Sequence, residues 1–302
     1  MHGVTHRLVL DVSSLGYRAF FALGDMMKDP EGRPVGLVHG YLDMVTRLVA
    51  TRRPDEVIHA YDHDWRPMAR TSIYPGYKAN RPPEPEGLPE QFALLRQALD
   101  LTGMLQVQAV DWEAEDAIGA LCAEAEGADL IEMVSGDRDL IQLVRDPVAK
   151  LLFTVRGVTE LLELDEAGVL DKYGIPAARY AEFAILRGDP SDGLPGVTGV
   201  GEKTARALIQ AYGSLDELLE DAATDDPREG PLRGKPALRA RLVASHDYLD
   251  AMRRIVPVSP DAKLEVWGGE RDDEALRSFG EANGLRGPVQ RLMAALDSAG
   301  AD

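Results

Sequence analysis

The sequence predicts an α/β fold, in which a mostly parallel sheet is flanked by helices and is followed by a helical region. Two observations lead to this prediction. In the first half of the chain, short strand-like runs alternate with amphipathic stretches. From about residue 180, glycine-rich turns and short helices replace the strand-like runs. We therefore expect an α/β domain over residues 1–180 and a helical region over residues 181–302.

The individual elements follow from hydrophobic spacing. Buried strands are expected at Arg7–Val12, Glu56–Tyr61 and Leu130–Ser135. The spacing predicts helices at Val35–Thr51, at Glu90–Thr102, from near Glu113, and at Ala205–Tyr212. Arg66–Pro89 is a long irregular stretch that is rich in proline. A loop of this length in a compact domain is usually functional or disordered.

Composition excludes several classes of protein. The chain has 302 residues, of which 45% are hydrophobic and 28% are charged, as in globular proteins. No apolar run approaches the ~18 residues of a membrane span, and the first residues lack the pattern of a signal peptide. The single cysteine, Cys122, excludes a disulfide framework and a zinc site built on several thiolates. The expected location is the cytoplasm.

The overall charge argues against a nucleic-acid partner. The 33 lysines and arginines are outnumbered by 51 aspartates and glutamates, which gives a net charge of −18. Nucleic-acid binding depends on basic side chains that neutralise phosphates. The distribution of the charge decides whether this objection holds.

Carboxylates follow the three predicted strands. Asp11, Asp62 and Asp137 each lie at or just after a strand end, and ligands of open α/β sheets bind beyond the carboxyl ends of the strands. Further acids stand at predicted turns and helix starts, namely Glu113, Glu115, Asp116, Asp139, Asp189 and Asp192. Taken singly, these acids also suit helix caps and turns.

The combination of acids favours a metal site. Two carboxylates ~4 Å apart repel each other by roughly 4 kcal/mol at an effective dielectric constant of 20, so a cluster requires protonation or a bound cation. Oxygen ligands without histidine or cysteine suit Mg²⁺ or Mn²⁺ rather than zinc. His63, which lies between two acids, is expected to be a solvated loop residue.

A glycine-rich segment, Leu194–Ala205, runs into the last predicted helix. Its backbone N–H groups and the positive end of the helix dipole suit it to bind an anion. A nucleotide-binding P-loop is excluded because Glu202 separates Gly201 from Lys203. The segment instead has the form of a hairpin between two short helices that holds a DNA backbone without reading its sequence.

These motifs resemble the bacterial 5′-3′ exonuclease and flap endonuclease family, which includes the 5′ nuclease domain that precedes DNA polymerase I. The matching blocks, in the family's order and spacing, are Leu10–Asp11, Tyr17–Ala22, Ala60–Asp62, Arg70, Tyr74–Arg81, Glu113–Asp116, Gly136–Leu140, Gly188–Asp192 and the glycine hairpin. The resemblance covers roughly Arg7 to Leu296. No polymerase region follows, so a stand-alone nuclease is expected.

The resemblance implies a PIN-like (Rossmann-like) sheet, an arch over about residues 66–105 and a helix-three-turn-helix over about residues 189–213. It implies a first metal held by Asp11, Asp62, Glu113 and Glu115. It implies a second metal held by Glu115 or Asp116 together with Asp137, Asp139, Asp189 and Asp192. The expected reaction is two-metal hydrolysis of phosphodiester bonds with Mg²⁺ or Mn²⁺, in DNA replication and repair.

The resemblance also implies contacts with a substrate. Lys78 and Arg81 match a basic pair that orients and neutralises the scissile phosphate, Arg18 and Arg70 match further phosphate contacts, and Tyr77 is expected to stack on a terminal base. Hairpin residues expected to bind duplex DNA are Gly196, Gly199, Gly201, Lys203 and Thr204, with K⁺ on the carbonyl groups of Val197 and Val200. The implied partner is DNA with a 5′ flap, a nick or a free 5′ end, RNA–DNA junctions included, bound by a monomer at the nucleoid.

Three positions depart from the family pattern. Glu115 stands where bacterial members usually have Asp, which is expected to shift a metal. Val12 follows Asp11 where Gly is usual, which is expected to tighten the strand end. Gly193 replaces the usual Asn and removes a side chain that would brace Asp192.

Two other functions stay open. A metal-dependent ribonuclease with the same sheet would leave the duplex-binding hairpin unexplained. A non-catalytic, structure-specific DNA-binding protein would be expected to lack some of the acids or the arch lysine, and this sequence has them all.

The distribution of charge permits DNA binding. Acids concentrate in the expected metal cluster and in residues 216–229 and 265–274, and the rest of the chain has a net charge of +1. Basic residues concentrate at Arg66–Arg81 and Arg233–Arg254. We therefore expect modest DNA affinity with a strong dependence on salt.

Overall fold

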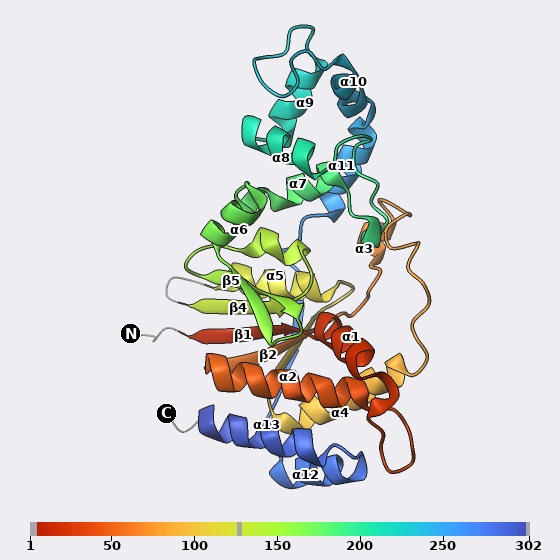
Figure 1. Cartoon of the computed structure of the whole chain (residues 1–302), viewed down its shortest axis with the longest axis vertical. Coiled ribbons are helices and arrows are strands. Elements are labelled where there is room, and N and C mark those ends of the chain that lie inside the picture. The colour runs from red at the N-terminus through yellow and green to blue at the C-terminus, as the bar shows by residue number, and fades with distance from the viewer. Residues whose placement is uncertain (1–4, 126–128, 300–302) are drawn as a thin grey trace.

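The computed structural model describes residues 5–125 and 129–299, which form one seven-stranded sheet with helices on both faces and a helical region at one end (Figure 1). The strands are β1 (His6–Asp11), β2 (Glu56–Tyr61), β3 (Leu105–Ala109), β4 (Leu130–Ser135), β5 (Ala149–Arg156), β6 (Glu160–Leu164) and β7 (Leu264–Trp267). Their order in the sheet is β6-β5-β4-β1-β2-β3-β7. The five central strands pair in parallel, whereas β6 and β7 pair antiparallel at the two edges. The predicted, mostly parallel sheet is confirmed.

Alternating side chains of the central strands face two separate cores. In β1, Leu8 and Leu10 belong to one core and Val9 to the other, as the two-residue period of a strand requires. The first core is closed by α1 (Val12–Leu23), α2 (Gly36–Arg52), α4 (Leu88–Thr102), α12 (Asp273–Ala282) and α13 (Arg286–Ala299). The second is closed by α5 (Ala114–Glu124), α6 (Glu166–Tyr173), α7 (Tyr180–Arg187) and the 3₁₀ turn Asp139–Leu143.

The helical region extends from the second face of the sheet and lies at the top of Figure 1. It contains α8 (Glu202–Ala211), α9 (Leu215–Ala223), α10 (Pro236–Ala244) and α11 (His246–Ile255). A short helix, α3 (Met68–Thr71), lies beside α11. Within the described residues, no helix is both long enough and apolar enough to cross a membrane.

Most of the predicted elements are confirmed with small shifts of their bounds. The strands at Glu56–Tyr61 and Leu130–Ser135 are present as predicted, and β1 begins and ends one residue earlier than expected. The expected helix at Ala205–Tyr212 starts three residues earlier, at Glu202. The strands β3, β5 and β6 were not among the predicted elements.

The helical region expected over residues 181–302 also contributes a strand to the sheet. The chain returns to the sheet after α11, where β7 pairs with β3 and α13 packs against α2. Without β7, the strand β3 would present unpaired N–H and C=O groups at the sheet edge. The helical region is therefore an insertion between β6 and β7.

The arch expected over residues 66–105 is shorter than predicted. Leu88, Leu95 and Leu99 of α4 are fully buried in the first core, so this helix belongs to the body of the domain. Within the expected arch, the chain between α3 and α4 runs along the outer edge of the molecule without a strand or a long helix (Figure 1). The arch therefore comprises residues 72–87.

A buried carboxylate lies within the sheet, at Glu132 of β4. Arg52 contacts both of its carboxylate oxygens, and Lys150 Nζ lies 2.9 Å from Oε1. Burial alone would raise the pKa of Glu132, but the hydrogen bonds from Arg52 and Lys150 outweigh it and lower the pKa to about 2. The ion pairs of Glu132 with Arg52 and Lys150 therefore connect β4 to α2 and β5.

Replacing Glu132 with Gln tests this network. Because its folded-state pKa is about 2 against an ordinary value of 4.5, the carboxylate stabilises the fold above pH 4.5 and this contribution is lost as the pH falls toward 2. Glu132→Gln is expected to lower the free energy of unfolding by about 3 kcal/mol at neutral pH and by clearly less in acid, as measured by urea unfolding. The exposed control Glu220→Gln should change it by less than about 0.5 kcal/mol. A loss that is equal at both pH values would contradict the assignment.

Candidate active site

The parallel strands bring the first acids together at one rim of the sheet. Asp11 ends β1 and caps α1, where its Oδ1 accepts a hydrogen bond of 2.9 Å from the Ser14 N–H. Asp62 follows β2, and its Oδ1 accepts one of 2.8 Å from the N–H of Ala114, at the start of α5. Burial and the nearby charge of Asp62 raise the pKa of Asp11 to about 7. The two carboxylates therefore share one site.

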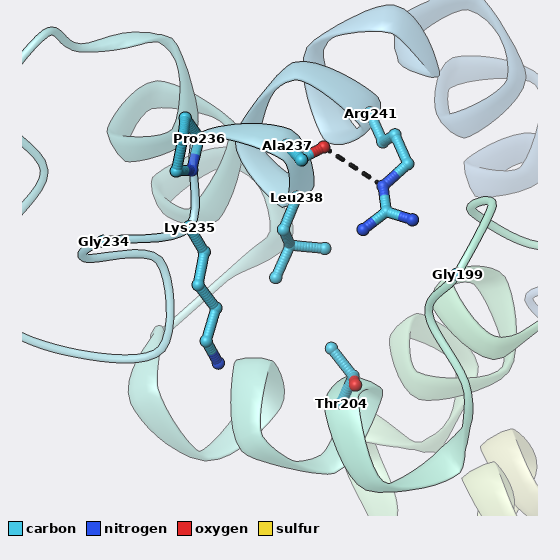
Figure 2. A pocket seen from close by; sticks show the side chains of 8 residues that line it. All are labelled: Gly199, Thr204, Gly234, Lys235, Pro236, Ala237, Leu238 and Arg241. Atoms are coloured by element: carbon cyan, nitrogen blue, oxygen red, sulfur yellow. Dashed lines mark hydrogen bonds between the residues drawn. The ribbon is translucent and has the colours of Figure 1, made fainter.

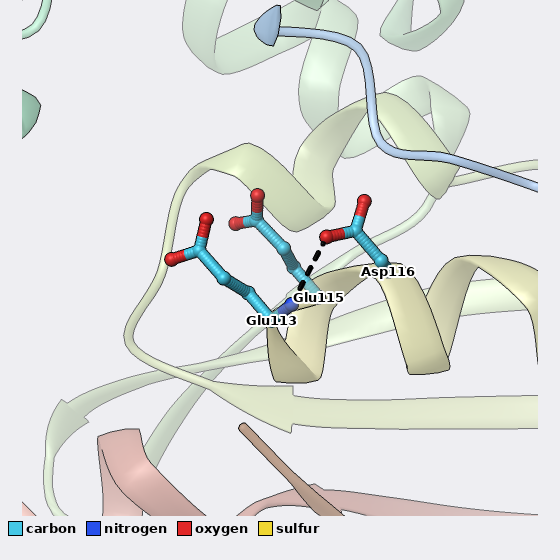
Figure 3. A group of neighbouring side chains, drawn as sticks. All are labelled: Glu113, Glu115 and Asp116. Carbon is cyan, nitrogen blue, oxygen red and sulfur yellow. Dashed lines mark hydrogen bonds between the residues drawn. The ribbon is translucent and has the colours of Figure 1, made fainter. Parts of the chain in front are cut away.

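The first turn of α5 supplies three more acids. Glu113, Glu115 and Asp116 project from the same side of the helix start (Figure 3), with carboxylate oxygens within 4.8 Å of one another. Asp116 Oδ2 also accepts a hydrogen bond of 3.3 Å from the Glu113 N–H, which forms a capping box. The acids thus cap the helix and form part of the cluster at the same time.

The remaining acids complete the cluster. Glu115, Asp137 and Asp139 place carboxylate oxygens within 4.8 Å of one another. Partial burial raises the pKa of Asp139, and so do the negative charges of Asp137, Glu115, Asp192 and Asp189. The structure therefore gathers all nine acids predicted from the sequence around one rim.

The donor set fits divalent cations. Every candidate ligand is a carboxylate oxygen, as Mg²⁺ and Mn²⁺ prefer. Burial and the charge of Glu115 raise the pKa of Asp116 to about 7, so the ionised form is disfavoured there without a further positive charge. A divalent cation would supply that charge.

Arg70 and Tyr77 are buried beneath the cluster. Arg70 is 1% exposed, and its guanidinium contacts Glu113 and lies 2.8 Å from Glu115 and 2.9 Å from Asp116. The Tyr77 hydroxyl donates a hydrogen bond of 2.6 Å to Glu113. Phosphate contact by Arg70 and base stacking by Tyr77 stay predictions, and in this structure the acids hold both side chains inside the protein.

Lys78 and Arg81 lie at the cluster, as expected. The Lys78 ammonium contacts Glu113 and lies 4.0 Å from Asp192, and Arg81 Nη2 lies 2.8 Å from Asp192 Oδ1. Lys78 has a positive φ of 51°, and its N–H donates a hydrogen bond of 2.9 Å to the Asp192 carbonyl. The start of the arch is thus docked on the turn that precedes the hairpin.

Gly193 explains how closely the arch approaches this turn. It has a φ of +73°, and a Cβ at this position would lie 2.5 Å from the Gly76 carbonyl oxygen. The Asn80 amide donates a hydrogen bond of 3.1 Å to the Pro190 carbonyl beside it. A side chain at residue 193 would push the arch away, and Asp192 is braced by Arg81 and Lys78 instead.

The other two departures from the family pattern also have a place in the structure. Val12 is the first residue of α1 and is fully buried, so Asp11 lies at a direct strand-to-helix junction. The Glu115 side chain, which is longer than that of the usual Asp, forms an ion pair with Arg70 that fixes its position. Arg18 packs against Gly136 at the same rim. A Cβ added at Gly136 would come within 2.9 Å of the Arg18 Nε.

The glycine hairpin lies between α7 and α8. Gly196 and Gly199 have φ values of +69° and +74°, which only glycine adopts without strain, and Gly201 is the N-cap of α8. The Val197 N–H donates a hydrogen bond of 3.0 Å to the Leu186 carbonyl of α7. Exposed Lys203 and half-buried Thr204 lie in the first turn of α8, while Val197 and Val200 are buried.

A pocket of about 380 Å³ separates the hairpin from α10 (Figure 2). Gly199 and Thr204 line one side, and Lys235 and Arg241 line the other. The Arg241 Nε donates a hydrogen bond of 3.1 Å to the Ala237 carbonyl, which leaves the end of its guanidinium directed at the pocket. The hairpin therefore faces a second basic surface.

Sequence reasoning missed the residues that hold the acids in place. Ser135 Oγ donates a hydrogen bond of 2.6 Å to Asp11, Ser13 Oγ donates one to Asp62, and the Ser259 N–H donates one of 2.9 Å to Asp116. Ser13 and Ser135 stand directly beside strand ends that carry acids, and this position is a signal that could have identified them. Ser259 lies far along the chain and carries no such signal.

Comparison with known proteins agrees with this geometry. The chain matches the 5′-3′ exonuclease N-terminal resolvase-like domain over residues 6–174 and the 5′-3′ exonuclease C-terminal SAM fold over residues 175–272. It is 40% identical over 306 residues to a 5′-3′ exonuclease of Streptomyces coelicolor, covering 96% of this chain and 99% of that protein. It is 38% identical over 316 residues to a 5′-3′ exonuclease of Mycobacterium tuberculosis, covering 96% and 98%.

Solved structures show the same fold. The T5 D15 protein, crystallised with metal ions, superposes with a TM-score of 0.67 at 18% identity, covering 97% of this chain and 99% of that one. This likeness confirms the predicted PIN-like sheet with its helical region. Because the matched domains and the similar full-length relatives span nearly all of the sequence, the chain belongs to the 5′-3′ exonuclease family.

Proposed function

We propose that this nuclease is structure-specific, and that it acts both as a 5′-3′ exonuclease and as a 5′-flap endonuclease on DNA in replication and repair. One observation supports this most directly. Acids from the ends of β1, β2 and β4, from α5 and from the turn before the hairpin meet at one rim, directly beneath basic residues of the arch. Carboxylates that can hold two metal ions, with fixed positive charges beside them, suit the hydrolysis of a phosphodiester.

We propose two metal positions within the cluster. The first is assigned to Asp11, Asp62, Glu113 and Glu115. The second is assigned to Glu115 or Asp116 with Asp137, Asp139, Asp189 and Asp192. Mg²⁺ or Mn²⁺ bound there would supply an activated water and positive charge at the leaving oxygen.

The arch and the rim supply the protein's own charges. Lys78 and Arg81 are assigned to orient the scissile phosphate and to neutralise its developing charge, for which each exchanges its carboxylate partner for a phosphate oxygen. Arg18 is assigned a further phosphate contact, because it lies at the same rim across Gly136. Arg70 and Tyr77 act from inside the protein, on the carboxylates.

The hairpin is assigned to hold the duplex part of the substrate. Backbone N–H groups of Gly196, Gly199 and Gly201, with Lys203 and Thr204, would contact phosphates, and K⁺ would bind the carbonyl groups of Val197 and Val200. The substrates proposed are DNA with a 5′ flap, a nick or a free 5′ end, and RNA–DNA junctions, bound by a monomer. In support, the T5 D15 flap endonuclease has been solved with DNA and metal ions, and the Rad2 catalytic core with a DNA substrate.

The variant Asp137→Asn tests the metal cluster. The neutral amide removes one carboxylate that lies beside Glu115 and Asp139, so single-turnover cleavage of a 5′-flap duplex should fall by at least about 100-fold. DNA binding should stay close to that of the unmodified protein. Asp171→Asn, at an exposed position of α6, is the matched control and should cleave normally. Cleavage by Asp137→Asn at an unreduced rate, or cleavage that persists in EDTA, would refute the assignment.

The variants Lys78→Ala and Arg81→Ala test the arch. Each removes one positive charge from the rim, and each is expected to slow single-turnover flap cleavage by about 100-fold with less effect on duplex binding. Lys263→Ala, which removes an exposed lysine between α11 and β7, should leave the rate unchanged. Rates within a few-fold of the unmodified protein for both arch variants would rule out their proposed role.

The variant Lys203→Ala tests the hairpin. If this exposed lysine contacts one phosphate, its loss should weaken duplex binding to a similar extent for all sequences. The slope of log affinity against log salt concentration should become shallower by about 0.9, which fluorescence anisotropy at several salt concentrations measures. An unchanged slope would place the duplex elsewhere on the molecule.

A further inference from the structure

Arg70 makes more contacts with the acidic cluster than a structural ion pair needs. Its Nη1 contacts Glu113 and lies 2.8 Å from Glu115 Oε1, while its Nη2 lies 2.9 Å from Asp116 Oδ1. The planar fork of one arginine thus spans all three carboxylates of the first turn of α5, which Figure 3 shows side by side.

The surroundings hold the guanidinium in place. Its central carbon lies 5.7 Å from the centre of the Tyr77 ring and 5.5 Å from that of Trp112. The Arg70 N–H donates a hydrogen bond of 3.0 Å to the Pro67 carbonyl, so the backbone turn also fixes the start of the side chain. At 1% exposure, this charge is part of the interior of the site rather than of the substrate-binding surface.

We propose that Arg70 is an internal counter-ion that competes with divalent cations for Glu113, Glu115 and Asp116, and that it thereby sets the metal affinity of the site. The inference rests on the metal cluster proposed above and concerns only this chain's own residues toward that metal. Arg70 is a positioning residue in this proposal, because its buried side chain acts through the carboxylates that it contacts.

The physical argument has two sides. Three buried carboxylates are costly without a positive charge, so Arg70 stabilises the folded protein when divalent cations are scarce. The same fixed charge, about 3 Å from the ligand oxygens, repels an incoming cation and uses oxygen lone pairs that the cation needs. Removal of the charge should therefore weaken the metal-free fold and strengthen metal binding.

The experiment titrates Mg²⁺ into the protein without DNA, by calorimetry, and follows thermal unfolding with and without excess Mg²⁺. Arg70→Met is expected to unfold at a lower temperature without metal, to regain most of that loss in Mg²⁺, and to bind Mg²⁺ about tenfold more tightly than the unmodified protein. Arg70→Lys keeps the charge and should bind Mg²⁺ within about threefold of the unmodified affinity. If Arg70→Met folds only in Mg²⁺, this rescue by the metal is itself an expected result. The Mg²⁺ affinity of Arg70→Lys is then compared with that of the unmodified protein.

The matched control is Arg52→Met, which removes one of the two basic partners of the buried Glu132, a carboxylate outside the cluster. It should lower the unfolding temperature with no rescue by Mg²⁺. The proposal fails if Arg70→Met binds Mg²⁺ as the unmodified protein does or more weakly, or if Arg70→Met and Arg70→Lys shift the affinity equally.

These measurements separate the inference from the proposed function. Loss of flap cleavage in a protein with the expected Mg²⁺ binding would refute the proposed substrate and leave the role of Arg70 intact. An unmodified protein that binds no Mg²⁺ would refute the metal site and the inference together.

Discussion

Repulsion among carboxylates at one rim of the sheet is the constraint on which the rest of this structure depends. Parallel strands and the start of α5 bring the acids together, and burial makes their charges costly. The basic side chains that pair with these acids come from a single segment of chain, because Arg70, Lys78 and Arg81 all belong to α3 and the start of the arch. The path of the arch is therefore determined by the acids it neutralises.

The same interactions join the two parts of the chain. Asp192 belongs to the turn that leads into the hairpin, and it accepts contacts from Arg81 through its side chain and from Lys78 through its carbonyl group. Gly193 allows the arch to approach within van der Waals contact of this turn. The turn that leads into the hairpin and the basic residues over the cluster are thus joined by direct contacts.

The features that the sequence predicts correctly depend on local patterns. The strands at Glu56–Tyr61 and Leu130–Ser135 are continuous buried runs, and the acids after them meet because parallel strands end at one rim. The burial of Arg70 was not predictable, because its direction depends on carboxylates more than forty residues later in the chain. The strand β7 has four residues, of which two are half-buried and two are exposed, and its pairing with β3 becomes apparent only in the folded sheet.

The return of the chain to the sheet through β7 changes what the helical region can do. A domain attached by one linker can swing freely, whereas this one is fastened at both ends to the same sheet, through α6 on one side and β7 on the other. The hairpin is also fastened to α7 by the Val197–Leu186 hydrogen bond. The two chain connections and this hydrogen bond restrict how far the hairpin can move relative to the acids at the rim of the sheet.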